Sequence, residues 1–462
     1  MSDSFVEMRI GDKRLEVVFD NITNRIGEKQ TLSMRKLAAC RNEEVQFGRF
    51  VGNHKVTVEL LEQQLYANTQ KNCHTAHCLL IEDTSQIGFS LHRSIKDMGK
   101  ADKGQIQGFY IHPVLAIDAR NFDCYGIAAL QFVSRPWPQQ ELTHKQSSCI
   151  RDKIPFEQKE GYRWFSSIKK ALPHCLNAAR KTVVADREAD IYPLLAGLSD
   201  ELGVDYVIRC RFDRPLQNGA TLFSDVDSWS EDSCYQIKVP ATDKRSAHSA
   251  NMIIKYGKVS LKKSRGKSTN IHAEHHSAYV VEVKEMLESV VNGEQPIHWV
   301  LLTTHYVGES QMALQITRWY KQRWTIEQVF RTLKSKGLKI ESSQLAEYGK
   351  LQKMTILALI AAVKVMQLIK ARDGETAQSI SVAFTEQEQR CLILLNNQLE
   401  GKTEKLKNPY LQDSLAFAAW VIARLAGWSG YKSQRPAGPI DFLTGLQRFN
   451  ERFLGYMLPK DS

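Results

Sequence analysis

The chain lacks long apolar runs, glycine-rich nucleotide-binding loops and a cysteine framework. Its longest apolar run, residues 356–369, is interrupted by Lys364 and is too short for a membrane span. The first residues are acidic without an apolar core, so we expect no secretory signal. The sequence contains neither a phosphate-binding loop ending in Gly-Lys-Ser/Thr nor a Gly-x-Gly-x-x-Gly motif, so we expect no nucleotide cofactor. The nine cysteines are odd in number and scattered, which is typical of a reduced cytoplasmic protein.

The composition is that of a folded protein with a basic surplus. The 462 residues are 43% hydrophobic and 24% charged, which is ample for one or more cores. Lys and Arg exceed Asp and Glu, giving a formal net charge of +11. This surplus favours an anionic partner, nucleic acid before membrane.

The expected elements follow the order of an α/β protein. Apolar residues at helical spacing predict helices over the first sixty or so residues. The elements that follow have the order of a ribonuclease-H-like core: strands at 79–85, 108–117 and 125–133, a helix over 162–180, a strand at 182–185, a helix near 193–198 and a strand at 206–209. Residues 212–305 are again expected to be rich in β-strands. A long helix is expected over 311–336, and the remainder of the chain is expected to be mostly helical.

The helix over 311–336 carries the most informative pattern. Between 318 and 340 there are seven basic residues and one acid, Glu327. One helical stripe holds charged and aromatic side chains: Tyr320, Arg323, Trp324, Glu327, Arg331 and Lys334. A separate stripe is apolar and is expected to pack: Trp319, Ile326, Phe330 and Leu333. A lone carboxylate among cations suits a metal ligand beside phosphate-binding groups, while ion pairs of Glu327 with Arg323 and Arg331 are the alternative.

Two aspartates could join Glu327. Asp83 is expected inside an apolar strand, on one face with Ile81 and Ser85. Asp186 follows the strand at 182–185, at the carboxyl end where α/β sites form. Buried carboxylates repel one another unless a cation neutralises them, and two divalent cations can activate water and stabilise the leaving oxygen in phosphodiester cleavage. Oxygen ligands favour Mg²⁺ or Mn²⁺.

Other interpretations of these acids stay open. Asp83 could be a turn or capping acid, and Asp186 could cap the helix that follows it. Four further acids could be the ligands instead: Glu82, Asp118, Glu188 and Asp190.

Two weaker patterns also stand out. Possible zinc ligands occur at Cys73, His74, His77 and Cys78, but their spacing is not that of a standard finger and no second half follows. A basic, turn-rich segment near Tyr256 could grip a DNA backbone or form a solvated hairpin: Lys255, Lys258, Lys262, Lys263, Arg265 and Lys267.

The basic helix resembles a known family. Tyr320, Arg323, Glu327 and Lys334 reproduce, with its spacing, the Tyr-x2-Arg-x3-Glu-x6-Lys signature of bacterial DDE transposases of the insertion-sequence-four family. Five other segments resemble that family in matching order along most of the chain. They are the surroundings of the two catalytic aspartates at 81–85 and 185–191, the end-binding domain at 11–15 and 48–51, and the dimerisation domain at 411–430.

The resemblance implies a role for each matching residue. Asp83, Asp186 and Glu327 would be catalytic and would bind metal, two Mg²⁺ ions per site with Mn²⁺ as a substitute. DNA contacts would come from Tyr320, Arg323, Lys334, Arg331, Arg209, Trp299, Arg49 and Arg14. Trp299 resembles the tryptophan that stacks on a base flipped out during hairpin formation, although a tryptophan in an apolar strand also suits a core.

The chain departs from the family pattern in two places. Arg331 stands where a member of that family has lysine, which keeps the charge but changes the hydrogen-bond geometry. The first 70 residues carry as many acidic as basic residues, so any DNA contact by Arg14 or Arg49 depends on arrangement and not on net charge.

We therefore expect three parts: a helical end-binding domain at 1–65, a ribonuclease-H-like catalytic domain at 66–372 with a β-rich insertion at about 212–305, and a helical dimerisation domain at 373–462. The resemblance implies cut-and-paste transposition by a homodimer in a synaptic complex with double-stranded transposon-end DNA and target DNA. It also implies a bacterial cytoplasmic, nucleoid-associated protein. The alternatives are a metal-dependent nuclease or resolvase, and a catalytically silent DNA-binding regulator.

Overall fold

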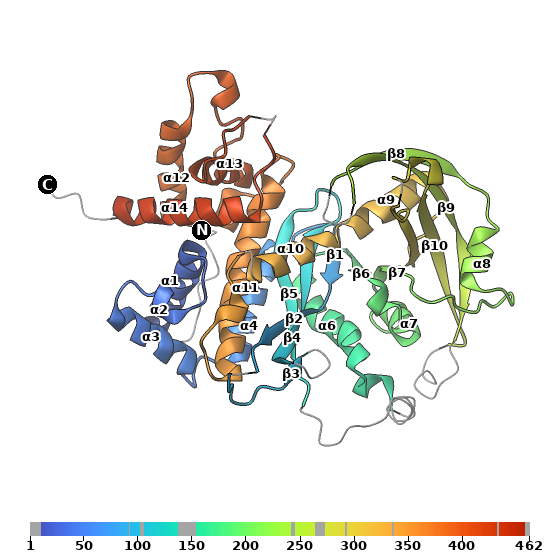
Figure 1. Ribbon diagram of the computed structural model, residues 1–462, viewed down its shortest axis with the longest axis horizontal. Helices are drawn as coiled ribbons and strands as arrows, with labels where there is room; N and C mark the ends of the chain where they lie inside the picture. The colour runs from blue at the N-terminus through green and yellow to red at the C-terminus, as the bar shows by residue number, and fades with distance from the viewer. Residues whose placement is uncertain are drawn as a thin grey trace.

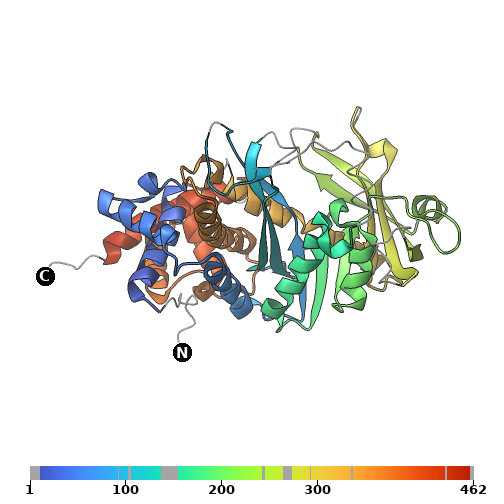
Figure 2. The ribbon, with the colours of Figure 1, turned by 90° about the horizontal axis from the view of Figure 1, so that it is seen from below.

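The structure is a computed structural model in which the described residues are 11–91, 93–101, 106–136, 154–241, 245–263, 273–291, 293–334, 337–431 and 434–457. In this part of the chain an eleven-stranded mixed sheet forms the centre of the molecule (Figure 1). The N-terminal and C-terminal helices lie side by side at one end, and strands from the expected β-insertion lie at the other (Figures 1 and 2). This is a mixed α/β architecture, consistent with the expected ribonuclease-H-like core.

The N-terminal part is helical, as the apolar spacing predicts. Its helices are α1 (Lys13–Lys29), α2 (Met34–Leu37), α3 (Arg41–Gly52) and α4 (Val58–Asn72). The apolar stripe of α1 is buried through Phe19, Ile22 and Ile26. Helix α4 packs against β5, and the expected domain boundary at residue 65 falls inside this helix.

The sheet contains every strand that the sequence predicts. The strands are β1 (His77–Glu82), β2 (Ser85–Phe89), β3 (Lys100–Ala101), β4 (Ile106–Asp118), β5 (Cys124–Val133), β6 (Arg180–Ala185), β7 (Asp205–Arg209), β8 (Ser233–Val239), β9 (His248–Lys262), β10 (His275–Glu285) and β11 (His298–Thr303). The main path runs β2-β4-β1-β6-β7-β11-β10-β9-β8, and β3 and β5 pair with β4. Strands β1, β6 and β7 are parallel neighbours, while β1, β4 and β5 are antiparallel.

Asp83 does not lie inside a strand, contrary to the expectation. It stands between β1 and β2, which both pair with β4 in one unshifted antiparallel register, from Glu82 opposite Val114 to Ser85 opposite Ile111. Asp83 therefore faces Pro113, which has no N–H to donate to a ladder. The next backbone N–H, that of Thr84, donates to Asp83 Oδ1 at 2.7 Å. The ladder is interrupted where the candidate ligand stands.

Alternate residues of the central strands face two different layers, as pleating requires. Leu79 and Ile81 join one apolar cluster with the N- and C-terminal helices, whereas Leu80 joins a second cluster. That second layer contains α6 (Arg163–Ala171), α7 (Tyr192–Asp200) and α8 (Leu222–Asp227). The helix expected over 162–180 is shorter, because α6 tightens into the 3₁₀ turn η3 (Leu172–Cys175), which contains a proline.

The single long helix expected over 311–336 is also wrong. The chain forms α9 (Ser310–Lys321) and α10 (Trp324–Leu333), joined at Gln322 and Arg323. Backbone bonds at the junction span three residues, as from Arg323 N–H to Tyr320 O, and such bonds overwind a helix. The predicted packing stripe is confirmed, because all four of its residues are buried: Trp319, Ile326, Phe330 and Leu333.

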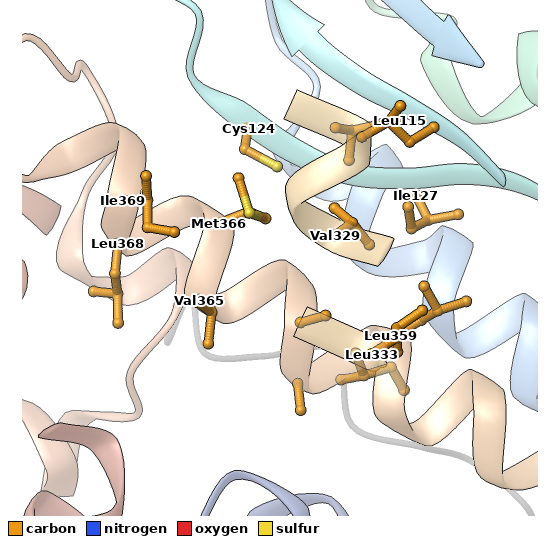
Figure 3. Packing of buried hydrophobic residues seen from close by; sticks show 14 of the residues in the cluster. Leu115, Cys124, Ile127, Val329, Leu333, Leu359, Val365, Met366, Leu368 and Ile369 are labelled. Carbon is orange, nitrogen blue, oxygen red and sulfur yellow. The ribbon is translucent and has the colours of Figure 1, made fainter. Parts of the chain in front are cut away.

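Helix α11 (Tyr348–Ala371) forms the centre of the first layer. Figure 3 shows Leu359 and Met366 of α11 near Val329 of α10, with Leu115 of β4 and Ile127 of β5 beyond them. Contrary to the expectation from the apolar run, α11 is long and apolar enough to cross a membrane by length and composition alone. Its most apolar window is 78% buried inside the protein, which is typical of a core helix.

The C-terminal part is helical, as expected. It contains α12 (Glu386–Leu399), α13 (Leu415–Leu425) and α14 (Pro439–Met457), and α14 packs against α1. Helix α13 is buried along almost its whole length. The expected boundary at residue 372 lies immediately after α11.

The β-insertion extends the central sheet. Strand β11 pairs with β7 of the core, and β10, β9 and β8 continue from it as antiparallel neighbours. The basic segment is not turn-rich up to Lys262, because Lys255, Lys258 and Lys262 lie in strand β9. Arg265 and Lys267 lie outside the described residues.

Candidate carboxylate site

Asp83 and Asp186 each stand immediately after the end of one of two neighbouring parallel strands, at the same level. Ile81 of β1 pairs with Val184 of β6, and each aspartate stands two residues further along its strand direction. Adjacent strands lie about 4.8 Å apart, so the two carboxylates are neighbours at the carboxyl edge of the sheet. Residues two apart share a face, and Ile81 and Val184 both belong to the layer that contains α9 and α10.

Glu327 approaches the same edge from α10, and Arg323 connects it to Asp83. Arg323 Nη1 donates a hydrogen bond to Asp83 Oδ2 at 3.2 Å. Arg323 Nη2 lies 2.7 Å from Glu327 Oε1. Among the described residues, the oxygens of the three candidate carboxylates are not all within 4.8 Å of one another. Of the two ion pairs expected as the alternative for Glu327, the one with Arg323 is present, and Arg323 pairs with Asp83 as well.

The electrostatics of Asp83 show that the three acids influence one another. Burial raises the pKa of Asp83 from 3.8 to about 7, and the negative charges of Asp186 and Glu327 act in the same direction. The Thr84 N–H and Arg323 oppose this rise. The carboxylate is thus held where its charge is costly without a cation.

Tyr320, Trp299 and Arg209 adjoin this group. Tyr320 is only 3% exposed, and its ring meets the half-buried Trp299 edge-on, with ring centroids 5.2 Å apart. Burial raises the pKa of Tyr320, and the charges of Arg323, Arg209 and Asp186 also act on its phenol. Arg209 ends β7 and donates to the carbonyl of His298, the residue before Trp299.

The remaining predicted DNA contacts lie along α10 or on the N-terminal helices. Lys334 follows Glu327 by seven residues, about 10 Å along the helix axis, and burial lowers the pKa of its ammonium. Arg331 is exposed on α10. Arg14 and Arg49 are exposed on α1 and α3 of the N-terminal part, and Arg14 lies 3.6 Å from Asp12.

Each of the competing acids has a different environment. Glu82 points to the opposite face and contacts His112 Nε2 at 3.1 Å, with both side chains fully buried. Asp118 ends β4 and accepts hydrogen bonds from Thr75 and Tyr125. The other two acids follow Asp186: Glu188 is 58% exposed, and Asp190 is completely buried against Arg214.

Asp186 has the capping role that the sequence offered as the alternative to metal binding. Its Oδ1 accepts the backbone N–H of Glu188 at 2.7 Å, which makes it the N-cap of the short 3₁₀ turn η4 (Arg187–Ala189). This cap fixes the side chain at the strand end and uses only one of its oxygens.

Residues that the sequence did not single out support the same edge. The Thr84 hydroxyl lies 2.8 Å from His112 Nδ1 and accepts from Arg163 Nε–H at 3.1 Å. Arg163 Nη2 lies 3.6 Å from Glu188 Oε2. In the sequence, only the position of Thr84 next to Asp83 could have indicated its part in the site. His112 and Arg163 could not be identified, because they reach the edge from elements distant in the sequence.

The donor set fits a hard divalent cation. Three carboxylates supply the oxygen ligands that Mg²⁺ and Mn²⁺ prefer, and a cation would relieve the repulsion acting on Asp83. Arg323 already brings positive charge between Asp83 and Glu327. The three side chains must draw closer than they are here to share one ion.

The raised pKa predicts how pH changes the stability of the metal-free protein. Asp83 has a higher pKa in the folded chain than its ordinary value of 3.8, so its stabilising contribution is full below about pH 4 and is lost as the pH rises through about 7. At about 1.4 kcal/mol per pKa unit, the loss is at most about 4 kcal/mol. We expect Asp83→Asn to remove this slope, so that its melting temperature relative to wild type increases between pH 5 and pH 8. An unchanged difference across this range would contradict the assignment.

A comparison with protein families bears on the chemistry of this site. One family model matches residues 167–364. This range contains Asp186, Glu327, Tyr320, Arg323 and Trp299, whereas Asp83 lies before it. Residues 167–364 match the family model described as the transposase DDE domain, and this match supports a DDE transposase.

Proposed function

We propose that the chain is a cut-and-paste transposase of an insertion sequence, most similar to the insertion-sequence-four family. It nicks DNA at the ends of the element, joins the freed 3′-hydroxyl to the other strand as a hairpin, opens that hairpin and transfers the released end into target DNA. The observation that carries the proposal is the position of Asp83 and Asp186 at the ends of two neighbouring parallel strands, with Arg323 connecting Asp83 to Glu327.

In this proposal Asp83, Asp186 and Glu327 hold the divalent cations, Mg²⁺ or Mn²⁺. When bound, the cations supply activation of the attacking water or hydroxyl and stabilisation of the leaving oxygen. Capping of η4 orients Asp186, and the bond from the Thr84 N–H orients Asp83. The contacts of Arg323 with two carboxylates hold both side chains at the edge of the sheet.

The basic and aromatic residues around the carboxylates suit DNA. Arg323 and Arg209 present guanidinium groups next to the site, and Lys334 and Arg331 extend the positive charge along α10. Positively charged side chains bind the phosphates of DNA independently of its base sequence. Trp299 is half-buried and contacts Tyr320, so one part of its ring surface is packed while another stays accessible for stacking.

The surfaces of the end helices support the assigned partners. Helix α14 ends with exposed apolar side chains, among them Leu454 and Met457, 51% and 46% exposed. Such side chains suit pairing of two protomers in a synaptic complex. The exposed Arg14 and Arg49 on the N-terminal helices are the contacts that we assign to transposon-end DNA.

Strand joining tests the proposed function. Purified full-length protein is incubated with Mg²⁺, labelled terminal DNA of its own element that still carries flanking sequence, and a supercoiled plasmid. We expect labelled terminal DNA to become covalently attached to the plasmid. Plasmid or end cleavage without joined product would instead indicate a nuclease or resolvase, and tight binding of the ends without cutting would indicate a regulator.

Hairpin formation gives a more specific prediction for Trp299. Stacking of a base on an aromatic side chain contributes about 1–3 kcal/mol, so Trp299→Ala should reduce hairpin yield about 5-fold to about 150-fold and leave the first nick. Trp299→Phe keeps an aromatic face and should recover part of the yield. Both products are read on a denaturing gel with end-labelled DNA. Wild-type hairpin yield in Trp299→Ala would contradict this role.

A further inference from the structure

Three buried cysteines meet at the amino end of β1, at the opposite end of the strand from Asp83. The thiol sulfurs of Cys73, Cys78 and Cys175 all lie within 4.8 Å of one another, and all three residues are fully buried. Cys73 follows α4, Cys78 is the second residue of β1, and Cys175 ends η3. Residues far apart in the sequence thus bring three soft ligands to one point.

This cluster corrects the zinc ligand set suggested by the sequence. Cys73 and Cys78 do come together, but Cys175 is the third member. His77 instead places Nε2 2.7 Å from Thr182 Oγ1 and packs edge-on against Trp319. Among the described residues, no other group of three or more histidines, cysteines or acids has its ligand atoms this close together.

A positive charge lies beside the cluster. Lys181 donates to the carbonyl of Ala178, three residues after Cys175, which keeps its ammonium near the sulfurs. A thiolate is the form of cysteine that binds metal.

The spacing and the charge both suit a thiophilic divalent cation. Zinc–sulfur bonds are about 2.3 Å long, so three sulfurs around one zinc lie about 4 Å apart, a distance these three thiols can adopt with small side-chain movements. Three thiolates and one divalent cation leave a single negative charge, which Lys181 can offset. A monovalent cation would leave two negative charges in a buried site, which is more costly.

We propose that Cys73, Cys78 and Cys175 form a structural zinc site. The site ties α4, β1 and η3 together. Its effect on catalysis is indirect: Asp83 lies five residues after Cys78, so the site fixes the start of the strand that leads to the carboxylate edge. The inference does not depend on the proposed transposase activity.

Metal content of the full-length protein tests this site. Protein purified from zinc-supplemented cells and washed with a mild chelator should contain one zinc per chain by elemental mass spectrometry. Cys175→Ala should lose it, whereas Cys391→Ala, which removes a buried cysteine outside the cluster, should keep it. Wild-type protein without zinc, or Cys175→Ala with a full equivalent, would overturn the proposal.

A second measurement uses only the wild-type protein, so its result does not depend on whether a variant folds. Cd²⁺ added to metal-free wild type should produce a thiolate-to-metal charge-transfer band that saturates at one equivalent, which carboxylate ligands cannot produce. Free thiols counted in denaturant, under anaerobic conditions, should include all nine cysteines. Absence of the band, or loss of two thiols to a disulfide, would overturn the proposal.

Discussion

Glu327→Gln is expected to abolish end cleavage while leaving the fold and DNA binding intact. Glutamine has the same shape and can still accept a hydrogen bond from Arg323 at the place where Glu327 Oε1 now lies 2.7 Å from Nη2. What is lost is the charge that a divalent cation requires. Changing even an outer partner of a metal ligand costs about 10–100-fold, so loss of a ligand should cost more than about 100-fold in rate.

The measurement is cleavage of end-labelled terminal DNA with Mg²⁺ or Mn²⁺, alongside a gel-shift assay on the same DNA. Glu188→Gln is the matched control, because Glu188 is an exposed acid two residues after Asp186 and pairs only loosely with Arg163. We expect it to cut at nearly the wild-type rate. Equal cutting by Glu327→Gln and wild type would mean that the active site lies elsewhere.

Asp190→Ala is expected to destabilise the protein strongly. The Asp190 carboxylate is completely buried and accepts from Arg214 Nε at 3.0 Å, with the backbone N–H groups of Arg211 and Phe212 at 2.7 and 3.0 Å. Removing one partner of a buried ion pair leaves the other charge uncompensated, at a cost of about 3–5 kcal/mol. Asp190 is therefore a structural acid, although the sequence alone allowed it as a metal ligand.

Calorimetric melting of the full-length variants measures this effect. Asp190→Ala should melt several degrees below wild type, whereas Glu188→Ala, two residues earlier and 58% exposed, should stay within about 0.5 kcal/mol of wild type. A normal melting temperature for Asp190→Ala would show that the Arg214 pair contributes little. It would also reopen the choice of acid at the end of β6.

The sequence predicted the helices and strands that carry the site residues better than the strand pairing that brings these residues together. Asp186 was placed after a strand because an apolar run ends before it, and that run is β6. The break at Asp83 could not be predicted, because it depends on the register with β4, which brings Pro113 opposite. Likewise, nothing near residue 83 indicates that Val184 pairs with Ile81 and so sets the two aspartates side by side.

The helix junction is a similar case. Gln322 and Arg323 are not residues that break helices, so periodicity predicted one helix where the chain forms α9 and α10. Arg323 contacts Asp83, which stands 240 residues earlier in the sequence, and this contact holds the junction in place. Local pattern also predicted the strands of the insertion but not their pairing with the core, which depends on β11 lying beside β7.

Metal mapping tests most directly whether the three carboxylates share a divalent cation. Fe²⁺ with ascorbate replaces Mg²⁺ in the full-length protein, and the hydroxyl radicals that form cut the backbone next to the bound ion. Our account predicts cuts beside Asp83, Asp186 and Glu327 together, all suppressed by excess Mg²⁺. Cuts confined to other segments, or cuts that Mg²⁺ does not suppress, would contradict it.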